Sequence, residues 1–119
     1  MEIFREFTFE AAHRLPCVPS GHKCARLHGH SYVVEVRVAG PVDPAAGWVM
    51  DFSDVKDAFA PLMARLDHTT LNEVPGLDNP TSENLAMWIW RGLAGSLPLS
   101  SVLVRETRTS GCVYRGEDE

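Results

Sequence analysis

The sequence has no long apolar run, no basic run and few cysteines, and each absence excludes a class of protein. No stretch approaches the about 20 consecutive apolar residues that a membrane-spanning helix needs, so we expect no membrane partner. Lys and Arg number 11 against 16 Asp and Glu, a net charge of -5. Proteins that bind nucleic acid concentrate positive charge on one face, so we expect no nucleic-acid partner either.

Only three cysteines occur, Cys17, Cys24 and Cys112. An odd number does not fit a disulfide framework. The N-terminus also shows no basic start followed by an apolar stretch and a small-residue cleavage site, as a secretory signal would. We therefore expect a cytoplasmic protein with reduced thiols that are available for chemistry.

The composition that remains is that of one globular domain. The chain has 119 residues, of which 45% are hydrophobic and 23% charged, and it shows no linker or internal repeat. We expect a single domain over residues 1–119. A domain of this size buries about two-thirds of its unfolded surface. Little room remains for both a complete core and a deep private pocket, which makes a site between subunits worth considering.

The apolar pattern predicts an α+β fold in which an antiparallel sheet is covered on one face by two helices. Alternation predicts strands at 3–9, 31–39, 101–107 and 112–114, with a short strand at 48–50 that returns to pair with 31–39. Apolar stripes predict helices at 54–66 and 82–93, capped by Ser53 and Thr81. The order is β-β-α-α-β-β. Its sheet edges invite association, and closed oligomerisation would remove them.

Three histidines suggest a metal site. In extended backbone, His28 and His30 lie on the same side of the chain, about 6.6 Å apart. His13 follows the first predicted strand and is the natural third ligand if the two strands are neighbours. Three histidines with an open fourth position are typical of catalytic zinc. The alternative is that they are unrelated core or surface histidines.

Two further features suggest proton transfer. Cys24 lies four residues before His28, where its thiolate could act as a base beside the metal or close the site as a fourth ligand. The spacing leaves both roles open. Asp67 could orient the imidazole of His68 and raise its pKa toward that of a useful acid, although the pair could also be an ordinary helix end.

A ligand-binding carboxylate is predicted at Glu106, which occupies an apolar position of its strand. A carboxylate there could accept two N–H groups from an amino-substituted heterocycle such as a pterin or guanine. The alternative is an edge-strand carboxylate that faces water or forms an ion pair with Arg105 or Arg108. Thr81 and Ser82 start a helix, and the free N–H groups of its first turn could also hold a ligand.

Five ordered motifs, at residues 9–15, 24–32, 66–68, 79–84 and 104–107, resemble those of the 6-pyruvoyltetrahydropterin and 6-carboxytetrahydropterin synthase family. The resemblance runs nearly end to end. It implies zinc on the three histidines, Cys24 as the catalytic base, Asp67 and His68 as the second proton-exchanging pair, and Glu106 as the anchor of the pterin ring.

The same resemblance implies the tunnelling fold, in which subunits join into an antiparallel barrel as a homo-oligomer, a hexamer made of two trimers or a tetramer, with active sites at the interfaces. The implied substrate is 7,8-dihydroneopterin triphosphate. Three residues separate Cys24 from His28. That spacing resembles the carboxy-forming branch, which serves queuosine and 7-deazaguanine synthesis and releases acetaldehyde and triphosphate. The pyruvoyl-forming branch, with five intervening residues, is one alternative, and a non-catalytic, zinc-stabilised pterin-binding module is another.

Overall fold

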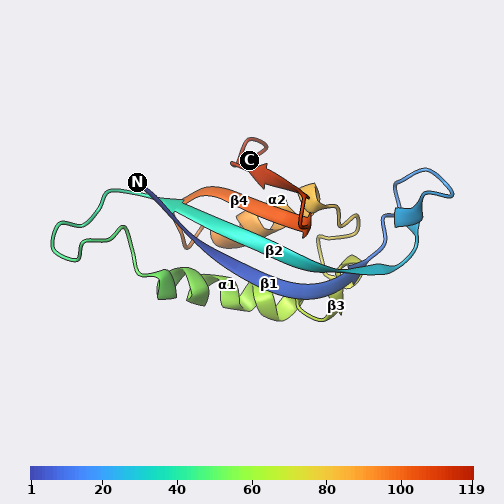
Figure 1. Ribbon diagram of the computed structural model, residues 1–119, viewed down its shortest axis with the longest axis horizontal. Coiled ribbons are helices and arrows are strands. Elements are labelled where there is room, and N and C mark those ends of the chain that lie inside the picture. The colour runs from blue at the N-terminus through green and yellow to red at the C-terminus, as the bar shows by residue number, and fades with distance from the viewer.

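The computed structural model describes all 119 residues and consists of a five-stranded sheet with two helices (Figure 1). The sheet order is β3-β1-β2-β4-β5, and every pairing is antiparallel except that of β1 with β3. The strands are β1 (Glu2–His13), β2 (His28–Ala39), β3 (Thr69–Thr70), β4 (Leu99–Thr107) and β5 (Ser110–Tyr114). The helices are α1 (Phe52–Leu66) and α2 (Ser82–Leu93), with short 3-10 turns at η1 (Lys23–Ala25) and η2 (Leu71–Glu73). The predicted α+β fold is confirmed, with a mixed sheet in place of a wholly antiparallel one.

A long hairpin of β1 and β2 forms the centre of the sheet. Its two strands pair over 12 residues each, from Glu2 opposite Ala39 to His13 opposite His28. Side chains alternate between the two faces of a strand. One face of the hairpin carries the fully buried Tyr32, Val34, Val36 and Val38, which pack in one core with apolar residues of both helices. Helix α1 contacts β1, and α2 contacts β4 and β5.

The hairpin is longer than the sequence pattern predicts. His13 is the last residue of β1. His28 and His30 are the first and third residues of β2, whereas the predicted strand began after them. The segment that joins the two strands is therefore shorter than the interval between the predicted strands at 3–9 and 31–39. All three histidines are therefore held by backbone pairing at the same end of the sheet.

Two local predictions before α1 are wrong. Residues 48–50 form no strand, because Gly47 with φ 79° and the hydrogen bond from Asp43 N to Trp48 O at 2.8 Å turn the chain there. Asp51, not Ser53, caps α1, since its carboxylate accepts from the Ser53 backbone N–H at 2.8 Å. The predicted cap of α2 is confirmed, because Thr81 accepts from Asn84 N. Neither helix combines the length and apolarity that crossing a membrane requires.

Candidate functional site

The hairpin brings the three predicted histidines together at one end of the sheet. His13 stands opposite His28 in the register, and His30 lies one alternation further along the same face. Ring centroids are 4.6 Å apart for His13 and His28, 4.8 Å for His28 and His30, and 5.1 Å for His13 and His30. One ring nitrogen of each lies within 4.8 Å of the others. These three side chains can hold one metal ion.

Backbone carbonyls fix which nitrogen of two rings carries the proton. His13 Nδ1 lies 2.7 Å from Pro80 O, and His28 Nδ1 lies 2.6 Å from Arg26 O. A carbonyl only accepts, so each Nδ1 donates and each neutral ring presents a lone pair on Nε2. The two Nε2 atoms are 3.1 Å apart. Two lone pairs at that distance repel each other unless a cation lies between them.

The distances suit zinc. Two nitrogens bound tetrahedrally at about 2.05 Å from zinc are about 3.3 Å apart, close to the separation of the two Nε2 atoms. His30 Nε2 is buried without any hydrogen-bond partner, which a bound metal would supply. Burial lowers the pKa of His30, against the opposing effect of Glu106, and so favours the neutral ring that binds metals. The carbonyls of Pro80 and Arg26 orient the other two rings, as second-shell acceptors do.

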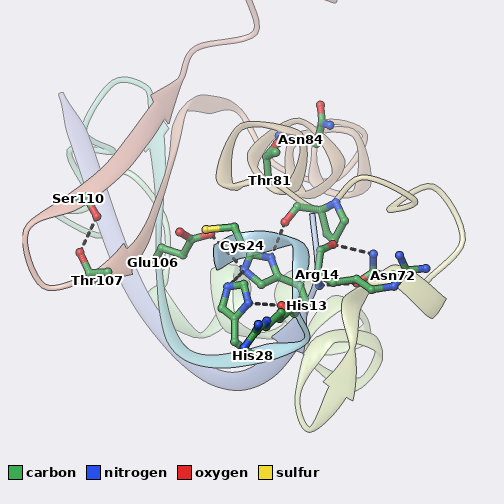
Figure 2. Close-up of polar contacts among 12 residues, drawn as sticks. His13, Arg14, Cys24, His28, Asn72, Thr81, Asn84, Glu106, Thr107 and Ser110 are labelled. Carbon is green, nitrogen blue, oxygen red and sulfur yellow. Dashed lines mark hydrogen bonds and ion pairs between the residues drawn. The ribbon is translucent and has the colours of Figure 1, made fainter. Parts of the chain in front are cut away.

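Cys24 lies in η1, in the loop that joins the two strands of the hairpin. Its backbone N–H donates to His22 Nδ1 at 3.0 Å, and its carbonyl accepts from Leu15 N at 2.8 Å, which ties η1 to the chain just beyond β1. The thiol is partly exposed. Cys24 does not belong to the group of mutually close ligand atoms, which consists of the three histidines alone. Figure 2 shows Cys24 and Glu106 on the same side of the His13 and His28 rings.

Glu106 faces the three clustered histidines from β4. Its Oε1 lies 3.6 Å from His13 Nε2, and 27% of the side chain is exposed. No ion pair joins it to Arg105 or Arg108, so the ion pair suggested as an alternative is not formed. The carboxylate is available to a ligand beside the three histidines.

Asp67 and His68 form the hydrogen-bonded pair that the sequence suggested. His68 Nδ1 lies 2.9 Å from Asp67 Oδ1, and the same oxygen accepts from Glu10 N at 3.0 Å. Glu10 O in turn accepts from His68 N, so one residue of β1 holds both members. The Glu10 N–H and the His68 contacts hold the pKa of Asp67 below its ordinary value, which keeps the carboxylate ionised. His68 adopts a left-handed φ of 59°, rare for a residue with a side chain.

This pair lies apart from the histidine triad of its own chain. No hydrogen bond or ion pair links Asp67 or His68 to the triad. Glu10 and Ser31, which are bonded to each other at 2.8 Å, alternate with the inward Ala11 and His30 and so occupy the opposite face of the sheet. His68 is 78% exposed and lines a hollow of about 560 Å³ with Glu10, Ser31 and also His30, which is the one triad residue that borders it.

The start of α2 reaches the same end of the sheet. Thr81 Oγ1 is used by the helix cap, accepting from Asn84 N at 3.1 Å, and Ser82 is 9% exposed. Pro80, one residue earlier, supplies the carbonyl that orients His13. Neither this carbonyl nor that of Arg26 could be predicted, because a backbone carbonyl leaves no side-chain pattern in a sequence.

Tyr32 is another residue that the sequence did not single out. The alternation pattern indicates only an inward-facing strand residue. In the structure its ring contacts His13 and His30, and its hydroxyl is buried without a hydrogen-bond partner. Burial, with a smaller effect of Glu106, raises the pKa of Tyr32.

Comparison with known proteins gives one consistent result. Residues 2–117 match the profile of a family described as "6-pyruvoyl tetrahydropterin synthase". The chain is 47% identical over 119 residues to a 6-carboxy-5,6,7,8-tetrahydropterin synthase of Synechocystis, covering 94% of this chain and 91% of that protein. It is 42% identical over 132 residues to a 6-pyruvoyl tetrahydrobiopterin synthase of Poecilia reticulata, covering 97% and 90%. The Caenorhabditis elegans 6-pyruvoyl tetrahydropterin synthase superposes with a TM-score of 0.88 at 28% identity, covering 98% and 95%.

Proposed function

The chain belongs to the 6-pyruvoyl tetrahydropterin synthase family, and from that premise we propose that this lyase is a zinc-dependent 6-carboxy-5,6,7,8-tetrahydropterin synthase. It would convert 7,8-dihydroneopterin triphosphate and water to 6-carboxy-5,6,7,8-tetrahydropterin, acetaldehyde and triphosphate. The 47% identity to a relative of that name and the three residues between Cys24 and His28 support this branch. We place the activity in the cytoplasm, on the route to queuosine.

The observation that carries the proposal is the pair of Nε2 lone pairs on His13 and His28, 3.1 Å apart beside the unpartnered His30 Nε2. Three imidazoles that converge with no fourth protein ligand suit a zinc site with an open position. Bound zinc supplies Lewis acidity toward the hydroxyl groups of the substrate side chain, which makes the adjacent carbons easier to deprotonate.

The chain's own residues then move the protons. We assign Cys24 as the base that removes a proton from the side chain of the substrate, because it lies on the same side of the His13 and His28 rings as Glu106 (Figure 2) and is not one of the clustered ligands. His68 exchanges a proton on the opposite side of the substrate, held in orientation by the ionised Asp67.

The ring is held at the same end of the sheet. Glu106 accepts N–H groups of the heterocycle, and the start of α2 at Thr81 and Ser82 completes the site. The Thr81 N–H already donates to Asn79 O at 2.9 Å, so the N–H of Ser82 is the one offered to the ligand. The availability of the Glu106 carboxylate supports its role, since no arginine or lysine pairs with it and His13 Nε2 lies 3.6 Å away. Positioning of this kind supplies part of the rate enhancement, because the side chain of the substrate must stay aligned with the bases.

A complete active site needs two chains in this proposal. His68 and Asp67 belong to the outer edge of β1, away from the triad, so the pair would serve the triad of a neighbouring subunit. The sheet has open edges at β5 and along most of β1, where β3 covers only Ala11 and Ala12. Pairing these edges between subunits closes a barrel and removes them. We propose a homo-oligomer, either a hexamer of two trimers or a tetramer.

The experiment is incubation with dihydroneopterin triphosphate and measurement of acetaldehyde. The proposed enzyme releases acetaldehyde and triphosphate in equal amounts. A 6-pyruvoyltetrahydropterin synthase is the second candidate, favoured by the 42% identity to the Poecilia reticulata protein. It would release triphosphate and form a reduced pterin without acetaldehyde.

A non-catalytic pterin-binding module is the third candidate, with Cys24 as the fourth zinc ligand. Cys24→Ala separates it from an enzyme. The module loses its zinc with the thiolate, whereas the enzyme keeps zinc on three histidines and loses turnover. Metal analysis of the purified variant gives the answer independently of any activity.

A further inference from the structure

Tyr32 has a buried hydroxyl that nothing in the folded chain satisfies. The residue is 0% exposed, and its hydroxyl has no hydrogen-bond partner. A buried hydroxyl without a partner destabilises a protein, so most such groups are bonded to protein or ordered water. Phenylalanine would fill the same space without that cost. We therefore expect the hydroxyl to form a hydrogen bond in a state of the protein other than the metal-free chain.

The ring of Tyr32 is fixed in place at the triad. It stacks on Phe9 with centroids 5.1 Å apart and an interplanar angle of 11°. Its other contacts are edge-to-face, with His13 at 5.9 Å and His30 at 5.6 Å. Packed on these sides, the ring cannot swing away to find a partner elsewhere.

Glu106 is the acceptor that the strand register brings nearest. Val34 stands opposite Val104 and Val33 opposite Arg105, so the same register extended by one residue places Tyr32 opposite Glu106. Directly opposed residues have Cβ atoms about 4.5–5.5 Å apart. Glu106 is also the one charged group that acts on the Tyr32 hydroxyl.

Metal binding changes what Glu106 can contact. Its carboxylate now lies 3.6 Å from His13 Nε2 and makes no other polar contact in the chain. The neutral ring of His13 turns the lone pair of Nε2 toward Glu106, which repels the carboxylate, whereas a metal cation on that nitrogen would attract the carboxylate toward the triad. The carboxylate has no hydrogen-bond donor in the chain, and the buried Tyr32 hydroxyl is an unused donor at the triad.

We propose that the Tyr32 hydroxyl donates a hydrogen bond to the Glu106 carboxylate when a metal occupies the three histidines, which makes Tyr32 a positioning residue for Glu106. The inference deepens the proposed function and rests on its metal site, not on which product forms. Tyr32 holds the carboxylate where the ligand meets the metal.

The test is the zinc dissociation constant of Tyr32→Phe, measured by competition with a chelator, together with the thermal unfolding of the metal-free protein. We expect the zinc dissociation constant to rise about tenfold, the loss of one charge-assisted hydrogen bond. We expect the metal-free variant to unfold at a higher temperature than the wild type, because an unsatisfied hydroxyl is gone. In a Glu106→Leu background, Tyr32→Phe should leave the zinc dissociation constant within about twofold.

Tyr114→Phe is the matched control. The Tyr114 hydroxyl donates to Glu119 at 2.6 Å and accepts from Asp118 N at 3.0 Å, so its removal should lower the unfolding temperature and leave zinc affinity unchanged. Unchanged zinc affinity in Tyr32→Phe, or an equal loss of affinity in the Glu106→Leu background, overturns the inference. A wild-type protein that does not bind zinc overturns the proposed function as well. Failure of the proposed function is thereby distinguished from failure of the Tyr32–Glu106 hydrogen bond alone.

Discussion

Mixed oligomers test whether the active site is divided between chains. The two halves are the triad with Cys24, and the pair of Asp67 and His68 at the outer edge of β1. Cys24→Ala and His68→Ala each leave the other half intact. Each variant alone should release little or no triphosphate from dihydroneopterin triphosphate, because every one of its sites lacks one of the two bases.

Mixing the two variants should restore activity. When chains are co-expressed in equal amounts, each half of a site is intact in half of the cases, so about one quarter of the sites carry both Cys24 and His68. We therefore expect about one quarter of the wild-type rate of triphosphate release per chain. Mixing Cys24→Ala with His30→Ala is the matched control, since both defects lie in the same half and each site keeps at least one of them.

The result that refutes the reasoning is absence of recovery in co-expressed oligomers that are shown to contain both variants. In that case both bases of each site come from one chain. Asp67 and His68 would then have to move next to the triad of their own chain when the oligomer assembles.

Three further predictions concern single residues. His28→Ala should weaken zinc binding by more than the about 10–100-fold that loss of a second-shell partner costs, as measured by chelator competition; unchanged affinity would contradict the metal site. Asp67→Asn should lower kcat about 100-fold, because it removes the negative charge that stabilises protonated His68, and retention of full kcat would remove the pair from the mechanism. Gly111→Ala should lower the free energy of unfolding by about 1–3 kcal/mol, because a Cβ at this position meets Val104 O and the Arg105 backbone. Gly95→Ala is the control and should be near neutral, because open space surrounds Gly95. Equal urea midpoints for the two variants would refute the packing argument.

Strand alternation carried most of the prediction of the metal site. The parity of His30 with Tyr32 and Val34 indicates an inward imidazole, and the structure places all three on the buried face. The proximity of His13 followed from assuming that the two strands are neighbours, which the hairpin register bears out. These are local patterns that a single strand reveals.

What could not be predicted depends on contacts between distant parts of the chain. The carbonyl of Pro80 lies 67 residues from His13, and no side-chain pattern marks it. The separation of His68 from the triad depends on a left-handed backbone at one residue and on hydrogen bonds to Glu10. The prediction of a strand at 48–50 was wrong for a related reason. A run of three apolar residues is too short to distinguish a strand from a turn.

The most direct test of the central claim is the stoichiometry of acetaldehyde and triphosphate formed from 7,8-dihydroneopterin triphosphate by zinc-loaded protein. The account predicts one acetaldehyde for each triphosphate, and loss of both products when a chelator removes the metal. Triphosphate release with a reduced pterin and no acetaldehyde would contradict the carboxy-forming assignment, and full activity after removal of the metal would contradict the role given to the three histidines.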